Sequence, residues 1–388
     1  MRINDLKDIT VADIIKGYVD KSDEEEGIYG YGGKLNIRPK YQRNFVYDDK
    51  KRSAVIRTLS KGFPLGIMYW VKNNDGTYEI LDGQQRTISI CEFIAKGLTG
   101  EGFSVECLFN HERPVTWSGL TPDERKELLS RKLLIYECEG VDEERLEWFH
   151  TINIAGEKLS GQEVRNAQYP CAWLTDARRY FSKTNKNHAR KYGSYYVSAD
   201  WNRQGGLEKV LKWRISDLND EKKLCAFMSD MKQKSDICGV EGATDLIDYY
   251  KAVIDWAQKI FPKKREKMDK VEWGILYNKY HDKEYDLDKI EEVVAKLYAD
   301  NDVTAKEGIY EYIFDNSESH LHIRQFSPEI KTHVYELQGQ KCKDCGQHFE
   351  LSELQAHHKI RWIDGGHTTV DNCVLLCRNC HGNRHRKE

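Results

Sequence analysis

Two Cys-x-x-Cys pairs near the C-terminal end constrain this chain more than any other feature of its sequence. The pairs are Cys342 with Cys345 and Cys377 with Cys380, and 31 residues separate them. Four thiolates arranged in two such pairs are the ligand set of a closed tetrahedral zinc site. A segment of about 60 residues builds little core by itself, whereas metal binding contributes on the order of 10 kcal/mol to folding. The spacing therefore predicts a small zinc-stabilised domain.

Histidines accompany the cysteines at two places. His357 and His358 are adjacent on a strand predicted over residues 354–360, so their side chains point to opposite faces and serve different purposes. His381 and His385 lie one turn apart on a predicted C-terminal helix and face the same way. Strand and helix together can bring three imidazoles to one point and leave an open coordination position. The alternative is a zinc knuckle whose histidines only add ligands or surface charge, but four cysteines already complete one zinc site and leave the histidines surplus to it.

The segment 342–385 resembles the HNH, or ββα-metal, endonucleases, in the branch with cysteine knuckles and an adjacent histidine pair. The turn Gly365-Gly366, then Asn372, then the His-x3-His spacing follow in the order of that family. The resemblance implies that His358 is the general base that takes a proton from the attacking water. It also implies that Asn372 bonds to the backbone around the base and fixes its orientation. The implied ligands of the catalytic cation, Mg²⁺ or Mn²⁺, are His357, His381 and His385.

A second polar motif lies near the N-terminal end. The run Asp-Gly-Gln-Gln-Arg-Thr at 82–87 follows a strand predicted over 78–81 and precedes a helix predicted over 88–95. Backbone amides at a helix N-terminus attract anions, and Arg86 can bind a phosphate through two N–H groups. By composition alone this segment is either a phosphate site or a structural turn. The candidate nucleotide-binding residues are Gln42, Arg43, Asp82, Gly83, Gln84, Gln85, Arg86 and Thr87.

Residues 8–170, which contain this motif, resemble the ParB/sulfiredoxin-like DGQQR family found as the N-terminal part of GmrSD-type restriction enzymes. The resemblance implies a domain that binds and hydrolyses a nucleoside triphosphate such as GTP, or one that senses DNA modification. Many GmrSD-type chains end in a different nuclease domain with a divergent His-x-x-Pro pattern. The resemblance therefore does not extend to regulation or substrate preference.

A basic stretch over residues 178–214 is the candidate DNA-binding surface. It holds ten Lys and Arg residues against two Asp and Glu residues, with aromatic residues interleaved. Neutralisation of phosphates by Lys and Arg supplies most non-specific affinity for DNA, and aromatic side chains stack on bases. The alternative is a solvated helical face over an aromatic core. The candidate DNA-contacting residues are Arg178, Arg179, Arg190 and Lys191.

These patterns predict three domains in a chain of 388 residues. Short apolar runs at 66–71, 78–81 and 131–138 predict strands. The expected organisation is an α/β ParB-like domain over 1–160, a helical domain over 161–325, and a zinc-stabilised ββα-metal domain over 326–388. No apolar run reaches the roughly 20 residues that span a bilayer, and the first residues lack a signal peptide's apolar stretch. We therefore expect a cytoplasmic chain with no membrane partner.

The function expected from these domains is metal-dependent DNA cleavage, gated by a nucleotide or by DNA modification, in the restriction of foreign DNA such as phage DNA. One alternative is a nucleotide-switched DNA-binding protein without catalysis, which would hold one zinc and no further divalent cation. Another is an HNH nuclease of a mobile element, which would recognise one long site. The net charge of −3 does not by itself indicate a nucleic-acid partner. A homo-oligomer is a further candidate state, because one HNH site nicks one strand.

Overall fold

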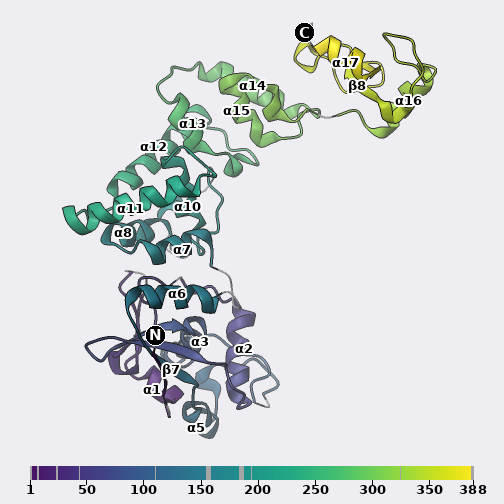
Figure 1. Cartoon of the computed structure of the whole chain (residues 1–388). Coiled ribbons are helices and arrows are strands. Elements are labelled where there is room, and N and C mark those ends of the chain that lie inside the picture. Colours follow the sequence, from purple (N-terminus) through teal and green to yellow (C-terminus); the bar gives the residue numbers. More distant parts are fainter. Residues whose placement is uncertain are drawn as a thin grey trace. The chain divides into compact units, whose positions relative to one another are not determined.

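The computed structural model describes residues 2–6, 8–22, 25–42, 44–109, 111–153, 159–182, 188–193, 195–323 and 325–385. The chain divides into two units, Met1–Ile254 and Asp255–Glu388. The border falls inside one long helix, α12 (Thr244–Ile260) (Figure 1). The three-domain division expected from the sequence stays a prediction.

A mixed sheet of seven strands organises the first part of the first unit. Strand β5 runs parallel to β7, strand β4 runs parallel to β6, and the other neighbouring strands pair antiparallel. The strands predicted over 66–71, 78–81 and 131–138 are observed as β5, β6 and β7. In sheet order the strands are β1 (Arg2–Leu6), β7 (Ile135–Glu139), β5 (Met68–Lys72), β6 (Tyr78–Asp82), β4 (Leu35–Asn36), β3 (Gly27–Gly30) and β2 (Val19–Lys21).

Helices flank this sheet, and their apolar faces form the core with the central strands. Trp70 of β5, Ile80 of β6 and Ile88 of the helix after the polar motif belong to one buried cluster. Asp48 caps the helix that begins at Asp49, because its carboxylate accepts the backbone N–H of Lys51 at 2.8 Å. These helices are α1 (Val11–Ile15), α2 (Asp49–Ser60), α3 (Gln84–Cys91), its π-helical continuation η3 (Glu92–Lys96), α4 (Gly97–Thr99), α5 (Pro122–Ser130) and α6 (Asp142–Asn153).

In the described residues from 159 to 254, the first unit is built from helices and the segments that connect them. Buried aromatic rings fill the space between them, and Phe181 packs edge-on against Tyr250 with ring centroids 5.3 Å apart. The hydroxyl of Tyr250 donates to the carbonyl of Ala189 at 2.8 Å. The helices are α7 (Gly161–Gln168), α8 (Ala172–Phe181), α9 (His188–Tyr192), α10 (Gly205–Arg214), α11 (Glu221–Cys238) and the first part of α12.

The second unit continues with helices and ends in a small two-stranded sheet. An aromatic cluster of Phe261, Trp273 and Tyr310 forms the core of its helical part. The C-terminal core is separate and centres on Leu375 and Leu376 of the last strand. The elements are α13 (Trp273–Tyr280), α14 (Leu287–Ala299), α15 (Ile309–Asp315), α16 (Pro328–Leu337), β8 (Leu354–His358), β9 (Cys373–Cys377) and α17 (Arg378–His385).

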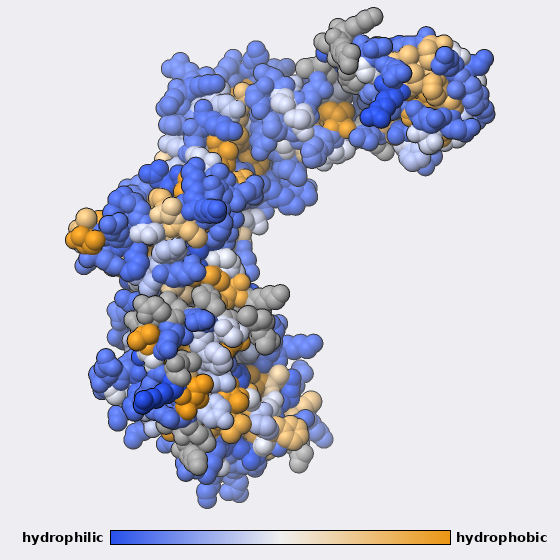
Figure 2. Space-filling model, in the orientation of Figure 1, coloured by the Kyte–Doolittle hydropathy of each residue, from blue (hydrophilic) through white to orange (hydrophobic). Residues whose placement is uncertain are grey.

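Apolar residues lie in small groups on a mostly hydrophilic surface, on the face that Figure 2 shows. Across the part of the chain that the structure describes, no helix combines the length and the apolar character needed to cross a membrane. The observed architecture is therefore a mixed α/β arrangement rich in helices with a small C-terminal sheet.

Candidate active site

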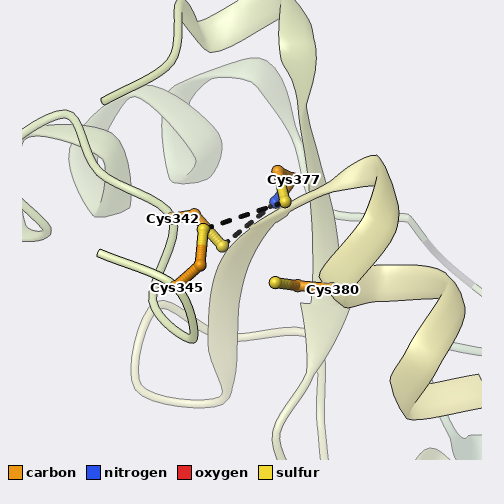
Figure 3. A group of neighbouring side chains, drawn as sticks. All are labelled: Cys342, Cys345, Cys377 and Cys380. Atoms are coloured by element: carbon orange, nitrogen blue, oxygen red, sulfur yellow. Dashed lines mark hydrogen bonds between the residues drawn. The ribbon is translucent and has the colours of Figure 1, made fainter. Parts of the chain in front are cut away.

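The four cysteines of the two pairs meet in the C-terminal module. Cys342 and Cys345 precede β8, Cys377 ends β9, and Cys380 lies in the first turn of α17 (Figure 3). Their Sγ atoms all lie within 4.8 Å of one another, and those of Cys345 and Cys377 are 4.0 Å apart. Zinc–sulfur bonds of about 2.3 Å in a tetrahedron place the sulfur atoms about 3.8 Å apart. The cluster therefore fits the zinc ion that the spacing predicts.

Backbone N–H groups around this cluster favour the thiolate form that binds a cation. The N–H of Gly346 donates to the carbonyl of Cys342 at 2.9 Å, and Gly346 has φ +67°, a left-handed conformation that favours glycine. The N–H of Cys377 donates to Sγ of Cys342 at 3.3 Å. Although burial opposes ionisation, backbone N–H groups at Cys345, Cys377 and Asp344 lower the pKa of Cys342 to about 7. A thiolate, the form that binds metal, is thus accessible near neutral pH.

The adjacent histidines occupy different environments, as their strand positions predict. In the antiparallel pair of β8 and β9, His357 lies opposite Val374 and His358 lies opposite Cys373. His357 is buried, and its ring meets that of His381 on α17 edge-on, with centroids 5.3 Å apart. Two of the three predicted metal ligands are therefore neighbours. The backbone of the third, His385, ends α17, but its side chain lies outside the described residues.

His358 is half-buried between an aromatic ring and a hydroxyl group. Its ring centroid lies 4.2 Å from that of Phe326, and its Nε2 lies 3.1 Å from Oγ1 of Thr368. Burial lowers the pKa of His358 below its ordinary value, and the nearby carboxylate of Asp302 only partly opposes this. The imidazole is consequently neutral at physiological pH and is able to accept a proton.

Asn372 joins the end of β8 to the glycine turn. Its Oδ1 accepts the N–H of Ile360 at 2.8 Å, and its Nδ2 donates to the carbonyls of Ile360 at 3.0 Å and His367 at 2.9 Å. The turn passes so close that a Cβ atom on Gly366 would lie 2.0 Å from the carbonyl oxygen of Ile360. The side-chain amide of Asn372 thus holds the backbone at Ile360, two residues after His358. Its role in orienting the base stays a proposal.

A cleft of about 750 Å³ opens beside these residues. His357, His358 and His381 all line it, and Lys331 and Arg361 add two cationic side chains. Three imidazoles and two cations in one cleft can bind an anionic substrate and move a proton. The remaining lining residues are Glu318, Ile323, Gln325, Phe326, Leu354, Gln355, Ala356 and Trp362.

The polar motif at 82–87 forms the junction of β6 and α3. Gly83 caps the helix with φ +101°, and a Cβ atom there would lie 2.7 Å from the side chain of Met68. Arg86 donates to the carboxylate of Asp82 at 2.7 Å and to the carbonyl of Leu65 at 2.6 Å. The side chain of Thr87 is fully buried. Glycine is therefore required by the backbone, and the arginine braces the turn.

Gln42 and Gln85 each precede an arginine in the sequence, and both side chains form hydrogen bonds with backbone groups. Gln42 donates to the carbonyl of Leu81 at 2.8 Å, while Gln85 accepts the N–H of Val46 at 2.8 Å. Gln85 also donates to Oε1 of Gln84 at 3.1 Å. These contacts support the structural-turn alternative, and nucleotide binding by these residues stays a proposal. Arg43, a further candidate, lies outside the described residues.

One candidate DNA contact, Arg178, is buried, so its expected surface role is wrong. Its side chain is 4% exposed and donates to the carbonyls of Lys40 at 2.6 Å and Gln42 at 3.2 Å. It also lies 3.6 Å from the carboxylate of Glu25, which in addition pairs with Arg38 at 3.1 Å. This guanidinium joins α8 to the loop between β4 and α2 and is too buried to lie on a DNA-binding surface.

The other three candidates of the basic stretch are exposed. Arg179 pairs with Asp176 one turn earlier on α8, at 3.0 Å. Arg190 and Lys191 lie exposed on α9. These three positions are compatible with the proposed contact to DNA phosphates.

Replacing Arg178 should destabilise the fold far more than replacing an exposed arginine of the same stretch. Arg178→Ala leaves the buried Glu25 with fewer compensating charges and is expected to lower the free energy of unfolding by about 3 kcal/mol. Arg190→Ala is expected to change it by less than about 0.5 kcal/mol. Chemical denaturation of the full chain measures both values, and equal stabilities would contradict the buried role.

Two residues of the site carry no local sequence signal. Thr368 follows the glycine turn and contacts His358, and Asp302 lies far upstream of every motif. Neither residue type nor spacing singles them out, since only the fold brings them to the histidine. Conservation of these polar residues across relatives is the signal that could have identified them.

Comparisons with known proteins match both ends of the chain. Residues 26–170 match the model of the GmrSD restriction endonuclease N-terminal domain, and residues 342–387 match that of the HNH endonucleases. The chain is 38% identical over 64 residues to the type IV methyl-directed restriction enzyme EcoKMcrA of Escherichia coli (strain K12). This match covers 15% of the chain and only 23% of that relative. No solved structure matches the chain.

The HNH match spans the cysteine cluster, the histidines and Asn372, so the expected HNH endonuclease domain is confirmed. The GmrSD-type match likewise agrees with the expected type of N-terminal domain. A ParB-like fold for that domain stays a prediction.

Proposed function

We propose that this chain is a metal-dependent DNA endonuclease that hydrolyses phosphodiester bonds in the cleft beside β8 and α17. The observation that carries the proposal is the placement of His357, His358 and His381 in one cleft, inside a segment that matches HNH endonucleases. The cysteine cluster lies in the same module and supports this proposal. A zinc ion bound there would fix β9 and α17 relative to the loop that carries Cys342 and Cys345.

His358 acts in this proposal as the general base. Burial keeps its imidazole neutral, so one ring nitrogen can take the proton of a water molecule aimed at the phosphorus atom. Lys331 and Arg361 bind the phosphates that flank the scissile bond. A divalent cation such as Mg²⁺ or Mn²⁺ held by His357, His381 and His385 would neutralise charge that develops on the scissile phosphate and the departing oxygen.

The biological role we infer is restriction of foreign DNA, with cleavage gated by the N-terminal domain. The GmrSD-type match supports a gate that responds to a nucleoside triphosphate or to DNA modification. The methyl-directed activity in the name of the Escherichia coli relative supports modification of the DNA as one form of the signal. An unregulated nuclease of this type would cut the DNA of its own cell.

Cleavage of supercoiled plasmid by the full chain tests both parts of the proposal. Nicked product should form with Mg²⁺ or Mn²⁺ and vanish with a chelator that removes them. The rate should depend on methylation of the plasmid, or on added GTP or ATP. A rate that is identical on every DNA without nucleotide would refute the gate. If the protein slows the migration of DNA in a gel but cleaves none of it, the non-catalytic DNA-binding alternative is favoured instead.

The form of the product tests the oligomeric state. One HNH site nicks one strand, so a monomer should accumulate open-circular plasmid, whereas a pair of chains acting together should yield linear plasmid directly. Product ratios measured against protein concentration separate these outcomes.

A further inference from the structure

The loop over residues 361–368 is held from two sides. From inside the C-terminal module, Asn372 bonds to the carbonyl of His367 at 2.9 Å. From outside it, the turn after α14 supplies two carboxylates, Asp300 and Asp302, within the same unit of the chain. The loop that follows the base is thus fixed by residues that lie before the HNH match as well as inside it.

The two carboxylates bond to groups on either side of the glycine turn. Oδ2 of Asp300 accepts the indole N–H of Trp362 at 3.0 Å. Oδ2 of Asp302 accepts the backbone N–H of Thr368 at 3.1 Å and lies 3.2 Å from Nδ1 of His367. Together these contacts leave the loop little freedom to shift relative to the turn after α14.

The position of Asp302 is itself restricted by burial and by a hydrogen bond within its turn. The residue is 8% exposed, and its backbone N–H donates to Oδ1 of Asp300 at 2.8 Å, which closes the turn. Burial of a carboxylate is unfavourable unless hydrogen bonds compensate for lost water. The bonds from Thr368 and His367 provide that compensation, so the carboxylate and the loop stabilise each other.

Thr368 links this carboxylate to the base. Its backbone N–H bonds to Asp302, and its Oγ1 lies 3.1 Å from Nε2 of His358. A hydroxyl can accept a hydrogen bond from Nε2–H or donate one to a bare Nε2, so this contact fixes the ring orientation in either tautomer. In the tautomer in which Nε2–H donates to Oγ1, the lone pair that accepts a proton from water belongs to Nδ1.

We propose that Asp302 is a positioning residue for His358, acting through the Thr368 hydroxyl. The inference rests on the proposed role of His358 as the general base. It makes cleavage depend on a residue of the helical part of the chain, 40 residues before the HNH match begins.

Paired substitutions of Thr368 in the full chain test the relay. Thr368→Val keeps the shape of the side chain but removes the hydroxyl, and Thr368→Ser keeps the hydroxyl. We expect Thr368→Val to lower kcat about tenfold with KM changed less than about twofold, and Thr368→Ser to retain most of the wild-type kcat. Asp302→Ala should lower kcat at least as much as Thr368→Val. The exposed Asp288 of α14 provides the control, Asp288→Ala, which should leave kcat unchanged.

A spectroscopic readout decides the relay even without cleavage. In the zinc-loaded full chain labelled with ¹⁵N-histidine, the imidazole signals of His358 are those lost in His358→Ala. We expect Thr368→Val and Asp302→Ala to shift the Nε2 signal, and Thr368→Ser and Asp288→Ala to preserve it. An Nε2 signal unchanged by both Thr368→Val and Asp302→Ala overturns the relay.

The two readouts keep the inference separate from the proposed function. Wild-type chain that cleaves no DNA refutes the nuclease, while the imidazole signals still decide whether Asp302 and Thr368 hold the ring. Wild-type cleavage with unchanged kcat in Thr368→Val and Asp302→Ala refutes the positioning role and leaves the nuclease intact.

Discussion

His358→Ala should lower the rate of plasmid cleavage by about 10³-fold, because removal of a general base typically costs 10²- to 10⁴-fold. The substitution removes the half-buried imidazole between Phe326 and Thr368 but leaves the cysteine cluster untouched. Zinc content and thermal unfolding should therefore stay close to those of wild type. Single-turnover cleavage of supercoiled plasmid, at saturating Mg²⁺ or Mn²⁺, measures the effect on the chemical step.

His333→Ala is the matched control for this experiment. His333 lies exposed on α16 in the same module, and alanine suits a helix. Its cleavage rate should equal that of wild type. A His358→Ala chain that cleaves at the wild-type rate would show that another group accepts the proton. DNA retardation by both variants would confirm that the loss lies in catalysis and not in binding.

Cys377→Ser should reduce bound zinc from one equivalent per chain to nearly none and unfold the C-terminal module. The thiol of Cys377 stands at the junction of β9 and α17, within 4.8 Å of the other three sulfur atoms. A structural zinc site contributes on the order of 10 kcal/mol, which exceeds what so small a core supplies. Elemental analysis of the purified chain gives the stoichiometry, and limited proteolysis reports the unfolding of residues after 326.

Cys373→Ala is the matched control, on the same strand. Its thiol is buried outside the cluster, and burial raises the pKa of Cys373 to about 11, so the group is a neutral packing side chain. The variant should keep one zinc and lose about 1–2 kcal/mol of stability through the small cavity. A full equivalent of zinc retained by Cys377→Ser, or lost by Cys373→Ala, would contradict the assigned ligand set.

Local sequence patterns sufficed for much of the C-terminal module. The strand predicted at 354–360 is observed as β8, and its adjacent histidines differ in burial although both line the cleft. The one-turn spacing of His381 and His385 fits the helix α17. Strands β5, β6 and β7 were equally predictable, because short apolar runs between turns are a local signal.

Charge counting was a poorer guide in the basic stretch. Arg178 and Arg179 are neighbours in the sequence, yet one is buried against Glu25 and the other is exposed. The two side chains leave the helix in different directions, and the surroundings of α8 decide which direction is the interior. Composition holds no information about those surroundings.

The sequence by itself determined the ligand types, their spacing and the elements that carry them, because these depend on residues close together in the chain. The tertiary structure alone decided that Asp302 meets Thr368 and that Arg178 meets Lys40. Both contacts join segments dozens of residues apart, which only the packing of whole helices and sheets brings together. A local pattern therefore identified the candidate base, His358, while long-range packing selected the residues that hold it in place.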